Sequence, residues 1–299
     1  MRQRSAILHI GVLGTGSAAR IAAAAPALAQ AGIAAPLGTA EALAALAQAH
    51  ARRPDRSDLD DRLAACCDAL AALPEGARGV MLSSERFAAL SEPGIAWLKR
   101  QFDALFHDCR VIACLDRHDR CALRQHAALL REGHAVADPF ALRLPDHARL
   151  LDRWSAAFGA DALTPCLAED LAAACGLSAL PPAPAPPALS AAAEALIARV
   201  LAAMAESGPA RRAAVADRLA TLLAGGSAPS LPPRAAAIAY CARYRAGDER
   251  VRARWFADGP ALFDADFSAY PEAAPPPPNA QATLDAAMRA LGALVDSAP

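Results

Sequence analysis

The chain has 299 residues, 55% of them hydrophobic and 20% charged, with a net charge of −1. Disordered proteins combine low hydrophobicity with high net charge, so this composition excludes a disordered chain. A balanced chain has no general attraction for phosphate, and aromatic residues make up only 5%, so nucleic-acid binding is not expected. No apolar run of about 18 residues lacks charge and proline, and the N-terminal apolar stretch is too short for a signal peptide. We therefore expect a cytoplasmic protein without a membrane span.

The basic residues and the cysteines limit which kinds of chemical site the chain can form. Lysine occurs once, at Lys99, and the other basic residues are arginine. Eight cysteines are too dilute for a disulfide scaffold and indicate buried, reduced thiols. No metal is expected, because the group of Cys109, Cys114, Cys121 and His118 contains no C-x-x-C pair.

Apolar runs alternate with helical patterns in the first part of the chain. Buried strands are predicted at residues 6–13, 79–83, 111–115 and 163–167. One helix is predicted after Ser84-Glu85, and the other helices in this part are predicted at residues 17–31, 40–51, 59–73, 118–132, 147–158 and 169–175. This alternation favours an α/β fold with a three-layer parallel sheet covered by helices on both faces.

Proline-rich segments divide the rest of the chain. After the run at 181–187, the pattern is helical at residues 189–204, 211–223, 234–244 and 249–255. A second run, at 275–278, precedes an amphipathic helix with an apolar stripe of Leu284, Met288, Leu291 and Val295. We expect four parts: a nucleotide-binding-like α/β core over 1–178, a linker over 179–189, a helical region over 190–257 and a C-terminal extension over 258–299.

The sharpest local feature is a glycine-rich loop between the first strand and the first helix, in the sequence HIGVLGTGSAAR from His9 to Arg20. Free N–H groups at such a helix start suit an anion. Gly14, Gly16 and Ala19 also fit the dinucleotide fingerprint G-x-G-x-x-A. That fingerprint needs an acidic residue about 20 positions on, and residues 33–40 contain none. An NAD(P)-dependent oxidoreductase stays open as an alternative.

A series of short motifs carries a resemblance to a known family. In chain order the motifs are His9–Gly11, Thr15–Ser17, Leu82–Glu85, Leu115–Asp119, Leu150–Trp154, Phe158–Gly159, Asp248–Phe256, Leu262–Asp264 and Tyr270–Glu272. Together, over roughly residues 6–272, they resemble the bacterial sulfotransferase-like family.

The resemblance implies a P-loop-like sulfotransferase fold that binds PAPS and transfers its sulfuryl group to a hydroxyl on a carbohydrate or small molecule. Phosphosulfate would be cradled by the loop, and a base would take the acceptor's proton. The implied cofactor-binding residues are Gly14, Thr15, Gly16 and Ser17 at the phosphosulfate, and Arg117 or Arg124 at the 3′-phosphate. The implied catalytic bases are Glu85 and His9.

The sequence departs from the family pattern where the chemistry lies. Gly14 stands where the family has a loop lysine, and Ala18 where it has a hydroxyl. Asp116 replaces an arginine, and Arg124 replaces a serine. Losing the lysine alone removes a charge-assisted contact of about 1.5–3 kcal/mol. We therefore expect a diverged member with a degraded donor site, and a non-catalytic relative that binds an anion or a partner protein is the alternative.

Three features allow a functional and a structural interpretation. Arg120, Arg124 and Arg131 share a helical face with Arg117, which is typical either of an anion site or of a solvated surface. Glu85 is either a general base or, with Ser84, a helix cap. The same question applies to the first-strand histidine, which is either a base or a core residue.

Overall fold

The computed structural model describes residues 4–54, 58–74, 76–136, 138–182, 189–224, 231–257, 259–273 and 279–296, without the side chains of residue 37 and residues 289–296. The chain forms two compact units that interleave along the sequence. Unit 1 comprises Met1–Arg117, Leu144–Pro184 and Tyr244–Phe263, and unit 2 comprises His118–Arg143, Ala185–Arg243 and Asp264–Pro299. Most of the expected linker, residues 183–188, and the proline run at 275–278 lie outside the described residues.

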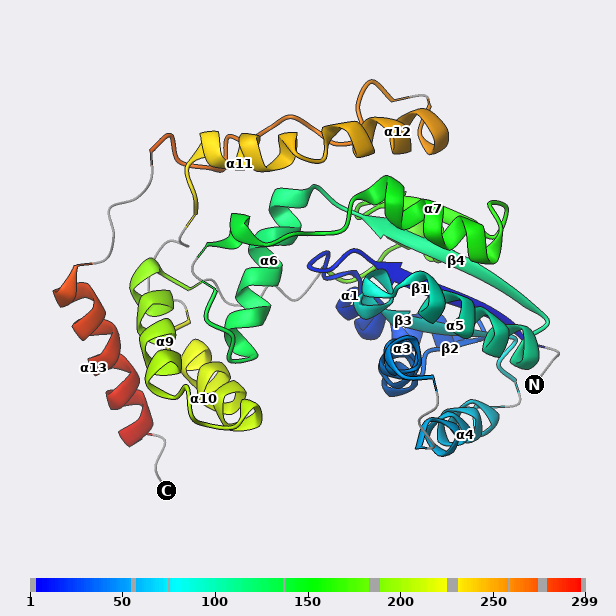
Figure 1. Cartoon of the computed structure of the whole chain (residues 1–299), viewed down its shortest axis with the longest axis horizontal. Coiled ribbons are helices and arrows are strands. Elements are labelled where there is room, and N and C mark those ends of the chain that lie inside the picture. Colours follow the sequence, from blue (N-terminus) through cyan, green and yellow to red (C-terminus); the bar gives the residue numbers. More distant parts are fainter. Residues whose placement is uncertain are drawn as a thin grey trace. The chain divides into compact units, whose positions relative to one another are not determined.

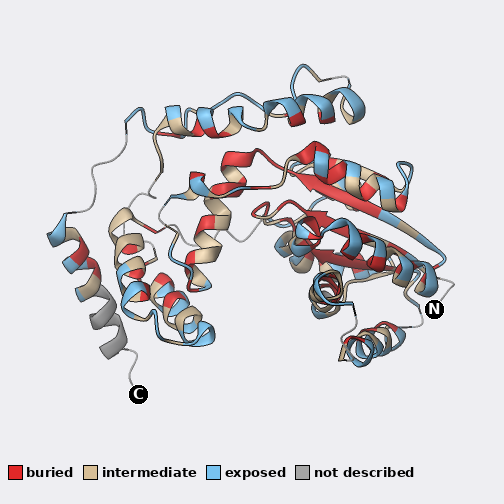
Figure 2. Ribbon diagram, in the orientation of Figure 1, coloured by how far each residue is buried: buried red, intermediate tan, exposed pale blue. Residues whose placement is uncertain are grey.

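Unit 1 is built on a parallel sheet that has five strands within the described residues, in the order β2-β3-β1-β4-β5 (Figure 1). The strands are β1 (Ser5–Gly11), β2 (Ile33–Ala34), β3 (Gly79–Ser84), β4 (Asp108–Leu115) and β5 (Leu163–Leu167). This confirms an α/β fold and four of the strands, while the two-residue β2 was not predicted. The central strands are almost wholly buried (red in Figure 2), which explains their continuous apolar sequences.

Helices flank both faces of this sheet. The helices of unit 1 are α1 (Ser17–Ala23), α2 (Ala25–Gln30), α3 (Leu37–Arg52), α4 (Asp58–Ala71), α5 (Glu92–Leu105), α7 (His147–Phe158), α8 (Leu171–Ala174) and α12 (Arg245–Trp255), with a 3-10 turn η1 at Glu85–Ala89. Of these, α4 packs on α3, and α12 packs on α7. From β1 the chain passes to β2 in one direction and then returns through β3, β4 and β5 in the other. Right-handed crossovers therefore place α1 and α2 on one face and α3, α5 and α7 on the opposite face. Ile21 and Leu28 pack on the first face against Met81 and Ile112.

Unit 2 is helical in the residues described. Its helices are α6 (His118–Arg131), α9 (Ala191–Ala203), α10 (Pro209–Leu222), α11 (Arg234–Ala242) and α13 (Ala280–Asp296), with a 3-10 turn η2 at Pro139–Ala141. Its core joins Ile197 and Leu201 of α9 to Ala216 and Ala220 of α10 and to Ala286 of α13. The small alanine side chains in this core let the helices of unit 2 pack closely against one another.

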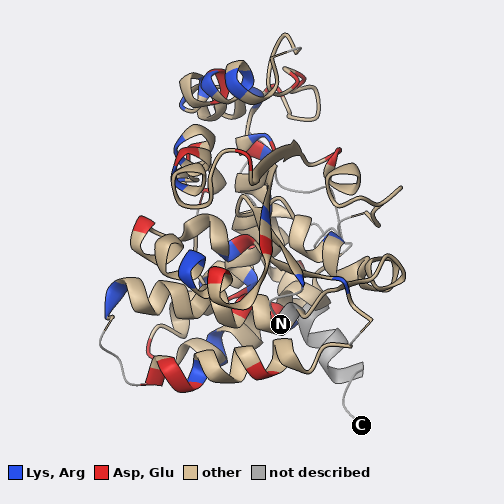
Figure 3. Cartoon of the chain, turned by 90° about the vertical axis from the view of Figure 1, so that its right-hand side faces the viewer, with Lys and Arg blue, Asp and Glu red and all other residues tan. Residues whose placement is uncertain are grey.

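The surface of the chain carries both charge signs. Lys and Arg are interspersed with Asp and Glu along the ribbon (Figure 3), as expected for a net charge of −1. Among the helices described, none has the length and apolar character that a membrane span requires.

Gly133 ends α6 and provides a test of packing in unit 2. Its φ is +81°, and a Cβ there would lie 2.8 Å from the backbone N of Ala213 and 2.8 Å from the carbonyl carbon of Arg212. Gly133→Ala is expected to lower the free energy of unfolding by about 2 kcal/mol, through left-handed strain and overpacking together. Gly176→Ala is the control, since its φ is +72° but its Cβ would meet nothing within 4 Å. Urea unfolding of both variants would contradict this view if their losses were equal.

Candidate anion-binding loop

The glycine-rich loop lies where the sequence predicts it, between the end of β1 at Gly11 and the start of α1 at Ser17. Gly14 and Gly16 have φ values of +87° and +70°, in the left-handed region that favours glycine. The Thr15 N–H donates to the Val12 carbonyl at 3.0 Å and closes the turn. The loop thus stands at the carboxyl end of a central parallel strand, which is where open α/β sheets bind ligands.

Glu85 occupies this loop with its own carboxylate. Its Oε2 accepts the Gly14 N–H at 2.8 Å, and its Oε1 accepts the Thr15 hydroxyl at 3.0 Å. The Thr15 hydroxyl also lies 2.6 Å from Ser17 Oγ. Because β3 pairs with β1, the residue that follows β3 lies beside the loop that follows β1. The carboxylate thus takes two donors that an anion in the loop would use.

Glu85 also belongs to a capped helical turn, as the structural interpretation of Ser84 and Glu85 predicts. It begins η1, and the preceding Ser84 caps this turn by accepting the Arg86 N–H at 3.1 Å. The turn directs the Glu85 side chain back toward Gly14 and Thr15. The cap and the carboxylate contact are therefore combined in one short segment.

His9 has the surroundings of a core residue. Its side chain is fully buried, and Nδ1 lies 2.9 Å from the hydroxyl of Ser83, its partner in the β1–β3 register. Burial lowers the pKa of His9 to about 3. Within the part of the chain that is described, Nε2 has no hydrogen-bond partner. A neutral imidazole with no exposed surface is poorly placed to take a proton from an acceptor.

Asp116 and Arg117 follow β4, which pairs with β1, so their backbone lies at the same edge of the sheet as the loop. Both residues are buried, and the Arg117 N–H donates to Asp116 Oδ1 at 2.7 Å. The implied phosphate ligand Arg117 is thus accompanied by a buried carboxylate from the adjacent residue. The negative charge of Asp116 weakens the site for a phosphate, because the two anions repel each other.

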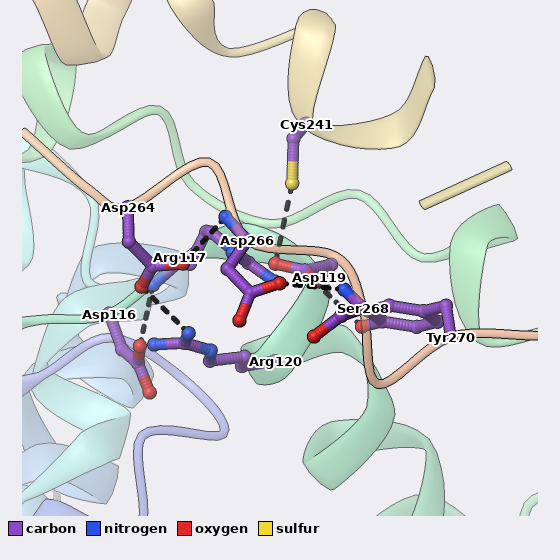
Figure 4. A network of polar contacts seen from close by, with 9 residues as sticks. All are labelled: Asp116, Arg117, Asp119, Arg120, Cys241, Asp264, Asp266, Ser268 and Tyr270. Atoms are coloured by element: carbon purple, nitrogen blue, oxygen red, sulfur yellow. Dashed lines mark hydrogen bonds and ion pairs between the residues drawn. The ribbon is translucent and has the colours of Figure 1, made fainter. Parts of the chain in front are cut away.

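The arginine stripe is partly neutralised by ion pairs within unit 2. Arg120 Nη2 lies 2.8 Å from Asp264 (Figure 4), and Arg131 Nη1 lies 2.7 Å from Asp217. Arg124, the other implied phosphate ligand, is half-buried on the same helix, α6. At least two arginines of the stripe therefore have carboxylate partners in the fold. Neither the anion-site nor the solvated-surface interpretation included such ion pairs.

A buried carboxylate in the first turn of α6 was missed by sequence reasoning. Asp119 is fully buried and accepts the Tyr270 hydroxyl at 2.6 Å and the Cys241 thiol at 3.3 Å (Figure 4). An acidic residue in a first helical turn is ordinary, so only its partners, more than 100 residues away, distinguish it. The segment that the resemblance assigns to the 3′-phosphate thus contains two buried carboxylates, Asp116 and Asp119.

A buried histidine–carboxylate pair was also missed by the sequence analysis. His147, at the start of α7, is fully buried, and its Nδ1 lies 2.9 Å from Asp248 Oδ1 on α12. Burial lowers the pKa of His147 to about 4, although Asp146 and Asp116 act to raise it. A 101-residue separation between the partners hides the pair from any local motif.

The residues present do not fit PAPS. Two donors of the loop, on Gly14 and Thr15, already bind Glu85. The single lysine, Lys99, lies on α5 and pairs with Asp103 on the same helix. With no lysine in the loop and the buried carboxylate of Asp116 beside Arg117, the donor set has the wrong charge for a cofactor that carries two anionic groups.

The strand order also bears on the dinucleotide alternative. In the dinucleotide-binding order 3-2-1-4-5-6, the second strand lies next to the first and carries the acidic residue to the ribose. Here β3 lies between β1 and β2, and β2 ends at Ala34, so that geometry is not formed. Comparison with family models, with curated proteins and with solved structures finds no match to this chain.

Proposed function

We propose that this chain is a sulfotransferase-like protein that no longer uses PAPS, a non-catalytic relative whose glycine-rich loop is closed by its own Glu85. The observation that carries the proposal is the carboxylate of Glu85 on the Gly14 N–H and the Thr15 hydroxyl. An internal carboxylate satisfies these donors without any external anion. The same bonds keep PAPS away from these donors, so we assign the protein no sulfuryl transfer.

The backbone at position 14 supports the loss of donor chemistry. A lysine at this position would have to adopt a φ of +87°, which costs an L-residue about 1–2 kcal/mol. Restoring the family's lysine is therefore a poor test of the site. Removing the Glu85 carboxylate tests it directly, because that change takes the internal anion away from the Gly14 N–H and the Thr15 hydroxyl and replaces no residue of the loop.

The test compares ligand-induced shifts in Tm for the wild type, Glu85→Ala and Glu85→Gln. PAP, PAPS, NAD, NADP and inorganic sulfate are each added in large excess, since a ligand at about 100 times its Kd stabilises a fold by roughly 2.7 kcal/mol. We expect no shift for the wild type with any of them, and no sulfuryl transfer from PAPS to phenol or sugar hydroxyls. We expect sulfate to stabilise Glu85→Ala, because the Glu85 carboxylate no longer occupies the Gly14 N–H and the Thr15 hydroxyl.

Glu169→Gln is the matched control, since Glu169 is an exposed glutamate of the same unit. It is expected to behave like the wild type. A clear shift of the wild type with PAP or PAPS would show an intact donor site and overturn the proposal. A shift with NAD or NADP would move the chain to the dinucleotide-binding class. If sulfate fails to stabilise the folded Glu85→Ala variant, the loop is not an anion cradle.

A further inference from the structure

A small cavity lies within unit 1, between α7 and α12. Its volume is about 220 Å³. The lining residues are Ala148, Leu151, Asp152, Arg250, Val251, Arg254 and Trp255. An apolar cavity of about 150 Å³ is enough for benzene, whereas drug-sized ligands need about 300–1,000 Å³. The space therefore suits a single ring or a short branched chain.

The two helices create this space through the sizes of their residues. At Gly247 they approach so closely that a Cβ would overlap the carboxylate of Asp146. Further along, the small Ala148 stands on α7 one turn before Asp152, and Leu151 and Val251 provide the remaining apolar wall. The helices thus touch at Gly247 and leave the cavity beside Ala148.

Two arginines one turn apart on α12 line the cavity. Arg254 is held in place, because it pairs with Asp152 at 3.1 Å and lies 4.9 Å from the centroid of the Trp255 ring. Arg250 is more loosely held: its side chain is 62% exposed, and its ion pair with Asp146 is 3.7 Å long. Each guanidinium group thus has one carboxylate partner, and the longer Arg250–Asp146 pair is the weaker of the two, so Arg250 is the group that an added acid can engage.

We propose that this cavity binds a small organic monoanion: an apolar body of one ring or a short chain that bears a carboxylate or a sulfate monoester. The apolar body packs against Ala148, Leu151 and Val251. The acid group accepts hydrogen bonds from Arg250 and, at the rim, faces the fixed Arg254. Guanidinium groups suit both acids, because their planar donors match two oxygens at once. The site is independent of the glycine-rich loop.

The experiment measures Kd by isothermal titration and by ligand-observed NMR on the full chain. Benzoate and phenyl sulfate are the two anionic probes, and benzyl alcohol and benzylamine are the neutral and cationic controls. We expect millimolar or tighter binding of at least one anion and at least tenfold weaker binding of both controls. The stronger of the two anions identifies the preferred acid group.

Three variants locate the binding. Arg250→Gln is expected to weaken the anion about tenfold, and Ala148→Leu to abolish binding by filling the cavity. Arg245→Gln is the matched control, since Arg245 is an exposed arginine of α12 that does not line the cavity. Absence of binding by either anion, equal binding of benzyl alcohol, or equal losses in Arg250→Gln and Arg245→Gln would each overturn the proposal. Because Arg250 is exposed, its variant stays informative even if Ala148→Leu fails to fold.

Discussion

The double variant His9→Asn/His147→Asn is expected to lose about 4 kcal/mol less stability than the wild type when the pH falls from 7 to 5. In the folded chain, burial lowers the pKa of His9 to about 3 and that of His147 to about 4. In the unfolded chain both titrate near 6.5. Between pH 6.5 and about 4 the unfolded state therefore binds protons that the folded state does not, so the folded state loses stability as the pH falls. By this linkage each histidine costs about 2 kcal/mol at pH 5.

Glu194 on α9 opposes this effect and makes the variant comparison necessary. Burial raises its pKa to about 7, so the folded state takes up a proton first and gains stability as the pH falls from 7 toward 4.5. The contribution of Glu194 is the same in wild type and variant and cancels in their difference. Urea unfolding at pH 7 and pH 5 gives the four free energies required. Equal pH dependence in both proteins would show that the two histidines are protonated in the folded state.

Gly11→Ala is expected to lower the free energy of unfolding by about 3 kcal/mol. A Cβ at Gly11 would overlap Ser17 Oγ and lie 2.8 Å from Thr15 Oγ1 and 3.0 Å from Glu85 Cγ. The methyl group therefore displaces the side chains that hold the loop closed, and both overpacking and lost hydrogen bonds contribute to the cost.

Gly79→Ala provides the control within the same sheet. A Cβ there would be 3.6 Å from the Ser5 carbonyl oxygen and 3.7 Å from Ile33 Cγ1, which are ordinary van der Waals distances. This change is expected to alter stability by less than about 1 kcal/mol. Denaturant unfolding of the two variants at pH 7 measures both values. A Gly11→Ala protein as stable as Gly79→Ala would mean that the loop is not tightly packed against Glu85.

The sequence predicts the sheet better than the details of its helices. Four strands are correct because each is an apolar run bounded by polar or glycine-rich segments. The two-residue β2 carries no such signal and exists only through its pairing with β3. The single helix predicted over 17–31 is wrong in one respect, since it breaks at Ala24 between α1 and α2. Pro26 explains the break, because proline inside a helix removes an N–H and clashes with the preceding turn.

The position of the glycine-rich loop can be predicted from neighbouring residues in the sequence, but its contact with the Glu85 carboxylate cannot. Its glycines and the strand before them are contiguous in the sequence, so the strand–loop–helix arrangement is predicted correctly. The contact of Glu85 with Gly14 joins residues 71 positions apart, and a residue type that serves as base, cap or ligand gives no hint of which it is. The partners of Asp119 and His147 are hidden for the same reason.

The interleaving of the two units has a consequence for synthesis on the ribosome. The sheet of unit 1 has all its described strands once Leu167 is made, but α12, which pairs with α7 through His147 and Asp248, begins only at Arg245. The segments of unit 2 at 118–143 and 185–243 are translated before unit 1 is complete. Unit 1 therefore cannot finish folding before two of the three segments of unit 2 are made, and unit 2 cannot finish before all of unit 1 is made. Domains commonly fold one after another from the N-terminus, and this interleaving prevents that order. A nascent chain halted before residue 245 exposes an α7 surface that α12 covers in the finished protein.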